Sequence, residues 1–331
     1  MNRKRIAQIA AAVSLIVLAS TAMYARAEGT FDRTLTVSGP VELDVATGSG
    51  HIYIKPGSGN QVQVHGIVRA SAFTSWLSGG GLSPDEKVKR IQQNPPIEQN
   101  GNVIHIGRIE DSELKRNVSV DYELTVPAAT RVTSNTGSGD QRIQGVQGPV
   151  ELRTGSGNVE VSQVGGEVRA ATGSGDVTVN GSKGGAHLST GSGNIHGTQI
   201  AGSLDASTGS GDIRLQQSAE GSVRVRTGSG DVELSGIKGG LTVGTGSGDV
   251  RVEGEPTAAW RVETGSGGVD LRVASQAGFD VYARTSSGRI SIDAPITQES
   301  ASNNRREIRG KVRGGGSMLD LHTGSGDITV R

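Results

Sequence analysis

The sequence predicts an all-β protein, a β-solenoid of about ten coils of 18–19 residues with one short capping helix. Three observations support this fold: a glycine-rich motif at a fixed interval, apolar residues at alternate positions, and a shortage of aromatic residues. The chain of 331 residues contains 52 glycines, whereas aromatic residues make up only 3% of it. A wide globular core normally draws on large aromatic side chains. We therefore expect many tight turns around a narrow core.

The motif Thr-Gly-Ser-Gly sets the length of one coil. Successive copies begin 18 or 19 residues apart through the second half of the chain. A fixed period near 20 residues is typical of stacked repeat proteins. The copies begin at Thr136, Thr154, Thr172, Thr190, Thr208, Thr227, Thr245 and Thr264, then at Thr285 (a degenerate copy) and Thr323, with earlier outliers at Thr47 and Pro56.

Apolar residues inside each coil predict two short strands. Counted from the threonine, they occupy positions 6 and 8, and again positions 15 and 17. In the coil that begins at Thr172 these residues are Val177, Val179, Ala186 and Leu188. A spacing of two is strand alternation, with one face buried and the other in water. The Thr-Gly-Ser-Gly corner and a second, variable glycine-rich turn would join the two strands of each coil. The pattern leaves the handedness of the solenoid open.

The repeated glycine corner is not a nucleotide-binding loop. The dinucleotide motif G-x-G-x-x-G fails, because after Gly173 and Gly175 the third glycine position is Thr178. No G-x-x-x-x-G-K-[ST] motif follows a predicted strand. We expect no cofactor.

Calcium is the more serious alternative for the corner, because calcium-binding β-rolls also stack glycine-aspartate turns. Weak candidate ligands recur at one corner position: Asp140, Asp176, Asp212, Asp231 and Asp249. Asn158 and Asn194 alternate with the first three of them. Asp and Asn share the ability to close a turn by bonding their own backbone. This alternation favours turn chemistry, with a calcium-stabilised β-roll as the alternative.

The N-terminal residues 1–27 resemble a signal peptide. Arg3, Lys4 and Arg5 precede an apolar stretch, and Ala25-Arg26-Ala27 offers a small-residue cleavage site. We expect export, a mature chain that begins at Glu28, and no stable membrane span after cleavage. Cleavage would leave 29 basic and 33 acidic residues, a net charge of −4. This mildly acidic balance argues against nucleic acid as a partner.

The chain has no cysteine, which excludes disulfides, cysteine-bound zinc and a lipid-modified N-terminal cysteine. Stability must therefore come from backbone pairing and packing.

Residues 28–135 are expected to form an N-terminal β region. Within it, residues 29–70 alternate strongly and predict a first coil or two. Ser83, Pro84, Asp85 and Glu86 are typical of a helix start, and Pro95-Pro96 would end that helix. We expect this short helix to cover the open end of the solenoid, because exposed sheet edges invite polymerisation.

Residues 136–331 are expected to form the repeat solenoid, interrupted by an inserted loop at 293–317. Basic residues gather in this segment: Arg305, Arg306, Arg309, Lys311 and Arg313. On a net-acidic chain such a cluster favours an anionic partner, either an acidic envelope polymer or the acidic face of another protein. A coil needs no such insertion to turn a corner, so we expect deletion of Ser300 to Gly314 to leave thermal stability nearly unchanged while it weakens partner binding.

The segments VDYELTVPAATRVTSNTGSGD (120–140) and GGGSMLDLHTGSGDITVR (314–331), with the repeats between them, resemble the bacterial family labelled "putative adhesin". That family is an exported β-strand-repeat domain of unknown function. The resemblance implies a β-solenoid in the cell envelope and brings no catalytic residues.

The function that these observations favour is a non-enzymatic, exported envelope protein, an adhesin-like structural or binding module in the periplasm or outside the cell. A polysaccharide-active enzyme is less favoured. A glycosidase needs two carboxylates at a set separation, whereas the acids here are spread along outward strand positions. We therefore predict no catalytic residue and no enzymatic activity.

Overall fold

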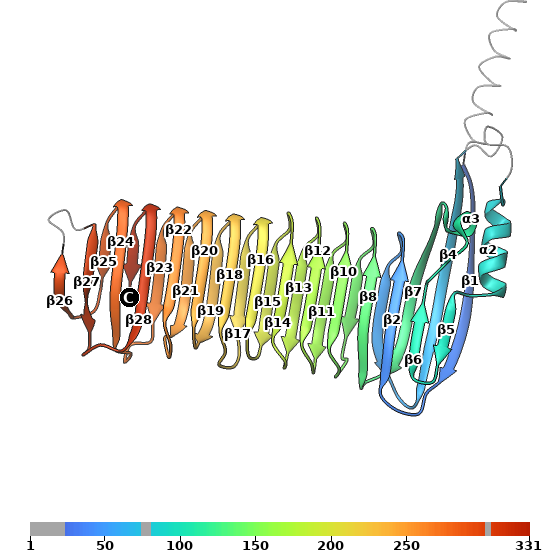
Figure 1. The fold of residues 1–331 in the computed structure, drawn as a ribbon, viewed down its shortest axis with the longest axis horizontal. Helices are drawn as coiled ribbons and strands as arrows, with labels where there is room; N and C mark the ends of the chain where they lie inside the picture. Colours follow the sequence, from blue (N-terminus) through green and yellow to red (C-terminus); the bar gives the residue numbers. More distant parts are fainter. Residues whose placement is uncertain (1–23, 74–80, 302–305) are drawn as a thin grey trace, which may run out of the picture.

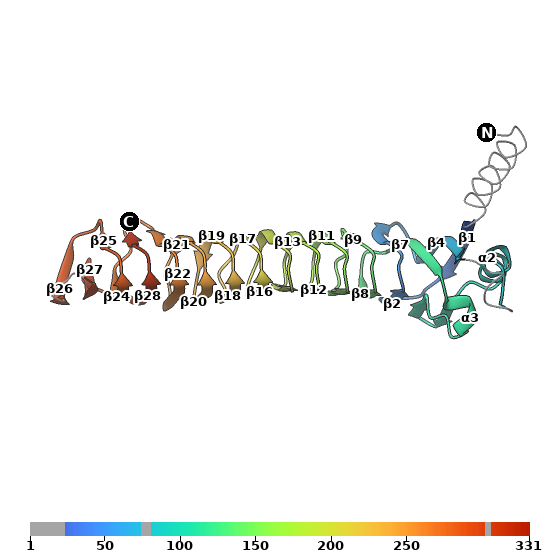
Figure 2. The same cartoon turned by 90° about the horizontal axis from the view of Figure 1, so that it is seen from above.

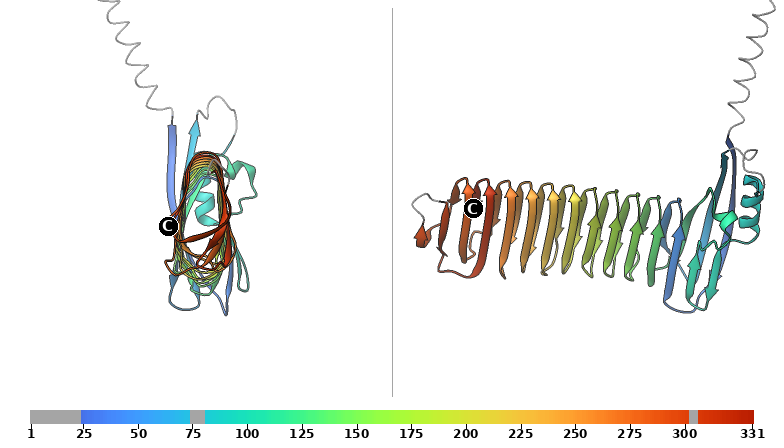
Figure 3. Two further views of the ribbon diagram at one scale, coloured as in Figure 1. Left: turned by 90° about the vertical axis from the view of Figure 1, so that its left-hand side faces the viewer. Right: turned by 45° about the horizontal axis from the view of Figure 1, so that its top comes forward.

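The computed structural model describes residues 24–73, 81–301 and 306–331, which form a long, flat β-solenoid (Figure 1). Seen from above, two extended sheets face each other along the whole axis, and the view along that axis shows a narrow oval section (Figures 2 and 3). In the described residues the first sheet has 14 strands and the second has 15. We call them sheet A and sheet B.

Sheet A runs in the spatial order β1 (Tyr24–Thr36), β4 (Gln61–Phe73), β7 (Val118–Pro127), β3 (Ile52–Gly57), β9 (Gln141–Gln144), β11 (Val159–Val164), β13 (Val177–Ser182), β15 (Ile195–Ile200), β17 (Ile213–Gln217), β19 (Val232–Lys238), β21 (Val250–Glu255), β23 (Val269–Val273), β29 (Ile328–Val330) and β25 (Ile290–Ile292).

Sheet B runs from the other end, in the order β26 (Ile296–Ala301), β27 (Glu307–Val312), β24 (Phe279–Ser287), β28 (Ser317–Ser325), β22 (Trp260–Ser266), β20 (Leu241–Ser247), β18 (Val223–Ser229), β16 (Leu204–Ser210), β14 (Ala186–Thr190), β12 (Val168–Thr172), β10 (Val150–Thr154), β8 (Thr130–Thr136), β2 (Val41–Thr47), β6 (Val103–Ile106) and β5 (Ile97–Asn100).

Each regular coil contributes one strand to each sheet, and equivalent positions of successive coils lie in register. Val177 of β13, for example, stands beside Val159 on one side and Ile195 on the other. Val177 and Val179 are 0% exposed, which confirms the predicted inward positions. The core is a single column of mostly aliphatic side chains between the sheets, together with the buried rings of Phe31, Tyr122, Trp260 and Phe279.

The N-terminal region joins the solenoid without a break. Strands β2 and β3 form one coil that stacks in parallel on β8 and β9, with Thr47 beside Thr136. Strands β1, β4 and β7 instead pair in antiparallel fashion. The alternation in residues 29–70 therefore contains one coil, between Val41 and Gly57, and two strands of an antiparallel cap. Alternation reports which face is buried, and it is the same for either strand direction.

Helix α2 (Pro84–Gln93) covers the N-terminal end, as expected. The Ser83 hydroxyl accepts a hydrogen bond from the Glu86 N–H, and the Glu86 carboxylate accepts one from the Ser83 N–H, which completes a capping box. Val88 and Ile91 are buried in the common core, and the helix packs on β1 and β4. A second helix, α3 (Ser112–Lys115), is a single turn between β6 and β7.

The C-terminal coil is not the last coil in space. Strand β28 pairs in parallel with both β22 and β24, and β29 pairs with both β23 and β25. The coil of the Thr323 motif therefore lies between the coil that starts at Trp260 and the coil that starts at Phe279. The degenerate Thr285 motif forms the outermost coil (Figure 1).

The segment that the sequence predicted as an inserted loop is a β-hairpin. Strand β27 pairs antiparallel with β24, and β26 pairs antiparallel with β27. Ile308 and Val312 of β27 are buried in the core. The hairpin covers the end of sheet B that β24 would otherwise form. Because Ile308 and Val312 are buried, we expect its deletion to lower the stability rather than leave it unchanged.

Residues 1–23 of the predicted signal peptide lie outside the described residues, and residues 24–27 begin β1. Within the described part of the chain, no helix has both the length and the apolar character that a membrane crossing requires.

Candidate functional site

The repeated corner is held together by a ladder of buried threonines. Thr154 Oγ1 donates a hydrogen bond of 3.1 Å to the carbonyl of Gly139 in the preceding coil, and accepts one of 3.1 Å from the N–H of Gly157 in its own coil. Thr172 repeats both bonds one coil further on, with Gly157 and Gly175. The threonine side chain therefore fastens each corner to the previous one.

Glycine is required at the fourth and second motif positions because the stacked corners lie so close together. A Cβ at Gly157 would lie 1.9 Å from the carbonyl oxygen of Gly139, and a Cβ at Gly155 would lie 2.4 Å from that of Gly137. Real side chains do not approach a carbonyl oxygen this closely. The corner excludes a side chain at these positions, and it leaves no space between coils for a phosphate.

The aspartates and asparagines form a second ladder beside the threonines. Asp140 accepts a hydrogen bond of 2.8 Å from the N–H of Asn158, and Asn158 accepts one of 2.9 Å from the N–H of Asp176. The Asp176 carboxylate in turn accepts a hydrogen bond of 2.7 Å from the N–H of Asn194. These side chains bond the next coil's backbone, whereas the sequence suggested that they bond their own.

The five calcium candidates all belong to this ladder. Each of their carboxylates accepts the N–H of the following corner: the acceptors are Asp140, Asp176, Asp212, Asp231 and Asp249. One side-chain oxygen per coil is thus occupied by the backbone. In the described residues no group of three or more His, Asp or Glu side chains is arranged to hold a metal ion. The ladder accounts for the aspartates through inter-coil hydrogen bonding.

The predicted basic cluster lies on strand β27 and its ends. Arg309 and Lys311 point outward on this strand, where they alternate with buried residues that include Ile308 and Val312. Arg313 follows at the turn, and its Nη1 donates a hydrogen bond of 3.2 Å to the Ala277 carbonyl. The carbonyl of Arg306 accepts a hydrogen bond from the N–H of Thr285. Arg305 lies outside the described residues.

Aromatic rings extend this cluster across sheet B. The Arg309 guanidinium lies 4.6 Å from the centre of the Tyr282 ring, within the range of a cation–π contact. On the other side of Tyr282, the ring of His322 stands edge-on at 5.3 Å, and His322 Nε2 lies 2.7 Å from the Asp320 carboxylate. Arg309, Tyr282 and Asp320 lie side by side, in register, on the neighbouring strands β27, β24 and β28.

A shallow hollow of about 800 Å³ continues the same outer surface toward the centre of sheet B. Gly244 lies at its floor, in the row where neighbouring strands carry Arg226 and Glu263. Arg261, Arg284 and His322 also line it. The absence of a side chain at Gly244 creates the dip. We call the outward basic residues of this region the basic face: Arg226, Arg261, Arg284, Arg309, Lys311 and Arg313.

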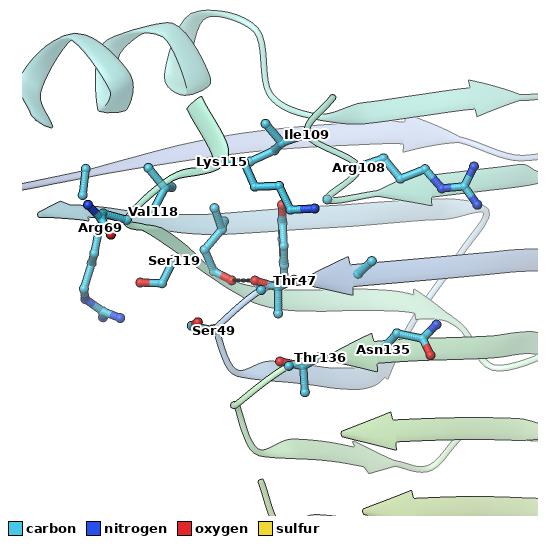
Figure 4. A pocket seen from close by; sticks show the side chains of 18 of the residues that line it. Thr47, Ser49, Arg69, Arg108, Ile109, Lys115, Val118, Ser119, Asn135 and Thr136 are labelled. Carbon is cyan, nitrogen blue, oxygen red and sulfur yellow. Dashed lines mark hydrogen bonds between the residues drawn. The ribbon is translucent and has the colours of Figure 1, made fainter. Parts of the chain in front are cut away.

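A second and deeper hollow lies at the other end, where the antiparallel cap meets the first coil. Its volume is about 1350 Å³, and it is lined by residues of β1, β4, the Thr47 corner, and the connection from Gly107 to Val120. Figure 4 shows Lys115 extending into this space above Thr47, with Ile109 and Val118 beside it and Arg108 and Arg69 at opposite sides. The sequence analysis did not identify this region.

The sequence profile described as Toastrack DUF4097 matches residues 166–331, which is half of the chain. The chain belongs to the Toastrack DUF4097 family. This confirms the predicted membership of a repeat family of unknown function.

Two solved structures are similar to the Toastrack chain over most of its length. One is described as a "putative cell adhesion protein" from Clostridium sporogenes; it is 9% identical, with a TM-score of 0.26, over 91% of this chain and 99% of that one. The other is a "putative adhesin" from Bacteroides fragilis, 14% identical, with a TM-score of 0.35, over 92% and 97% of the two chains. No curated protein matches the sequence.

Sequence reasoning missed three features of this Toastrack chain that bear on function. The threonine of each motif was treated as part of a turn, although it continues the inward alternation of positions 15 and 17 and could have been placed in the core. Tyr282 lies beside Arg309 only because the hairpin strand β27 folds back on β24. The deep hollow depends on where the 107–117 connection leaves the solenoid, and no local pattern carries that information.

Proposed function

We propose that this Toastrack protein is a non-enzymatic, exported module of the cell envelope that binds an anionic polymer along its basic face. The observation that carries the proposal is the gathering of six basic side chains on the outer surface of sheet B, between β18 and the β26–β27 hairpin, although Arg261 is ion-paired with Glu263 and Asp320. The acids close to them are fewer: Glu263, Asp280, Glu307 and Asp320. The excess of positive charge favours an anionic partner.

The arrangement of the strands supports a polymer rather than a small ligand. Neighbouring strands of a sheet lie about 4.8 Å apart, so outward side chains on successive strands form a regular row. An extended polyanion could contact several rows at once, and Tyr282 adds a flat apolar surface between Arg309 and His322. The shallow dip at Gly244 gives such a chain a path across the strands. The corner ladders contribute rigidity and no chemistry.

The test measures binding of the purified chain to polygalacturonate, a carboxylate polysaccharide, with neutral dextran as the reference polymer. The charge-reversed variant carries Arg309→Glu, Lys311→Glu and Arg313→Glu. The matched control carries Arg142→Glu, Arg214→Glu and Arg251→Glu, which change the net charge equally but lie on the outer surface of sheet A. We expect the first variant to lose about tenfold in affinity and the control to lose about twofold.

Equal losses in the two variants would mean that net charge alone drives the binding, and would overturn the assignment of the basic face. Binding of dextran as tightly as polygalacturonate would overturn the anionic class. Export is tested separately: N-terminal sequencing of the protein from the periplasm or medium should begin at Glu28, whereas an intact Met1 in the cytoplasm would contradict the proposed location.

A further inference from the structure

Strand β20 carries a glycine at an outward position where the other coils have a side chain. Gly244 directly precedes the motif threonine Thr245. In the other coils that carry the motif, this position holds residues such as Ser207, Arg226 and Glu263. A glycine inside a strand lowers stability, because it loses more conformational freedom on folding and has no side chain to pack. Glycine at this position is therefore unfavourable for the strand itself.

The fold does not require this glycine. The motif glycines are required by the neighbouring corner, since a Cβ at Gly155 would lie 2.4 Å from the carbonyl oxygen of Gly137. A Cβ at Gly244 would have no atom within 4 Å, and the φ of Gly244 lies outside the left-handed region. No neighbouring side chain has moved into the space above it. Neither packing nor backbone conformation thus accounts for glycine here.

A glycine in a strand interior often marks a place where a ligand approaches the backbone closely. Gly244 lies in the hollow of about 800 Å³ on the outer surface of sheet B. The motif glycines Gly246, Gly265 and Gly324 line the same hollow from the neighbouring strands β20, β22 and β28. The hollow therefore has a floor of bare backbone on three neighbouring strands, and Gly244 widens it.

The hollow runs across the strands, along the axis of the solenoid. Five residues that line it lie in register on the neighbouring strands β18, β20, β22, β28 and β24: Arg226, Gly244, Glu263, His322 and Arg284. Neighbouring strands lie about 4.8 Å apart, so the four steps from the first residue to the last span about 19 Å. An elongated ligand fits this shape better than a compact one.

The two ends of this row are positively charged. Glu263 in its middle is ion-paired with Arg261, which also lies 3.9 Å from Asp320. Within the described residues, Arg226 and Arg284 form no ion pair. Water can satisfy both exposed guanidinium groups, so the glycine floor is what indicates a ligand. The two arginines determine that a chain lying on this floor meets a positive charge at each end.

We propose that the anionic polymer of the basic face runs along the solenoid axis through this hollow, with its backbone on Gly244 and anionic groups at Arg226 and Arg284. The inference rests on the proposed function for the class of polymer, and it adds the path and the residue that permits it. Gly244 is a positioning residue. A side chain at this position would lift the polymer from the floor and away from the two guanidinium groups.

The test measures binding of polygalacturonate to the variant Gly244→Thr, which changes no charge. Threonine has room at this position and is favoured in strands, so the variant should melt at or above the wild-type temperature. Its affinity for the polymer should nevertheless fall about tenfold, and Gly244→Ala should lose about threefold. The matched control is Ala171→Thr, in the same row four strands nearer the N-terminal end, which should bind as the wild type does.

The two arginines test the direction of the path. Arg226→Gln and Arg284→Gln should each weaken polygalacturonate about threefold, because each removes the charge at one end of the row. Arg153→Gln, in the same row on β10, should leave the affinity unchanged. A loss with Arg284→Gln but none with Arg226→Gln would restrict the polymer to the side of the hairpin and overturn the path.

Failure of the path can be distinguished from failure of the proposed function. Wild-type affinity in both Gly244 variants, together with the expected loss in the charge-reversed variant of Arg309, Lys311 and Arg313, would overturn the path and leave the basic face in place. Equal losses in Gly244→Thr and Ala171→Thr would also overturn the path. A wild-type chain that does not bind polygalacturonate would overturn the proposed function, and the path with it.

Discussion

The interior coils and the two ends of the solenoid bury similar aliphatic side chains but satisfy their backbone in different ways. In the interior, each strand has a parallel neighbour on both sides, in register except for shifts in the β15–β17 and β19–β21 pairs, and the Thr and Asp ladders repeat from corner to corner. At the N-terminal end the pairing becomes antiparallel through β1, β4 and β7, and helix α2 packs outside them. A regular coil cannot end its own stack, because its outer edge would expose unpaired N–H and C=O groups.

The C-terminal end solves the same problem by another route. The last coil in sequence is inserted between two earlier coils, and the β26–β27 hairpin covers the edge of sheet B. Both ends therefore depend on contacts between residues distant in sequence, whereas an interior coil contacts mainly the coils 18 or 19 residues away. Repeated coils therefore form the interior of the solenoid, and irregular segments end the stack. The candidate surfaces described above lie at or near these irregular segments.

The largest expected effect comes from a charge placed in the middle of the stack. Val177→Asp should lower the free energy of unfolding by about 4 kcal/mol or more, because it buries an unpaired carboxylate between the sheets. Val312→Asp introduces the same charge at an equally buried position of the terminal hairpin, where local opening can expose it to water. We expect a loss of about 1–2 kcal/mol there, with β27 amides exchanging faster in hydrogen exchange.

Chemical denaturation of the two variants measures this difference. A loss at Val312→Asp as large as that at Val177→Asp would show that the hairpin unfolds only with the whole solenoid. Thr178→Asp, outward in the same strand as Val177, serves as the control and should cost less than about 1 kcal/mol.

A matched pair of glycines compares a stacked corner with the uncovered one. Gly155→Ala should lower the free energy of unfolding by about 3 kcal/mol, because its Cβ would meet the Gly137 carbonyl and force the coils apart. Gly48→Ala, at the same motif position, should cost less than about 1 kcal/mol, because no atom lies within 4 Å of the new Cβ. Equilibrium urea unfolding measures both losses in the free energy of unfolding. Equal losses would contradict the open space around Gly48.

The aspartate ladder predicts a smaller effect. Asp176→Ala removes the acceptor of the Asn194 N–H and should cost about 1 kcal/mol. Asp176→Asn keeps a side-chain oxygen at this position and should be nearly neutral, as the natural Asn158 and Asn194 indicate. Both variants should melt at the same temperature in millimolar calcium and in chelator. A calcium-dependent rise that Asp176→Asn abolishes would favour the β-roll alternative.

The smallest effect concerns the cap of α2. Hydrogen bonds from the Ser83 N–H and hydroxyl lower the pKa of Glu86 below its ordinary value of 4.5. A carboxylate with a depressed pKa stabilises the fold above its unfolded-state pKa, and this contribution is lost as the pH falls through the folded pKa. The protection factors of the α2 amides, which correct for the pH dependence of intrinsic exchange, should therefore fall on acidification below pH 4.5.

Glu86→Gln should remove the pH-dependent part of that change while Ser83 still caps the helix. An acid response of α2 that is the same in the wild type and in Glu86→Gln would assign the effect to another carboxylate.

The interior of the solenoid could be read from the sequence almost residue by residue. The fixed interval between motifs predicted the coils, and alternation predicted that Val177, Val179, Ala186 and Leu188 face the core. Local capping chemistry likewise predicted helix α2 from Ser83 onward. Of the candidate sites, the sequence indicated the basic residues of 306–313 but neither their strand nor the aromatic ring beside them.

The repeated coil can be predicted from the sequence alone. The interval between motifs, the alternation of apolar residues and the turn residues are local signals, and they recur in each coil. The order of the last coils, the antiparallel cap and the place where the chain leaves the stack after Gly107 instead depend on contacts between residues distant in sequence. A strand that ends in the Thr-Gly-Ser-Gly motif fits beside any other copy, so the motif at Thr323 cannot state which two coils it joins. The departure of the chain at Gly107 leaves no mark on Gly48, which is 59 residues away in sequence and has the same motif as the regular corners.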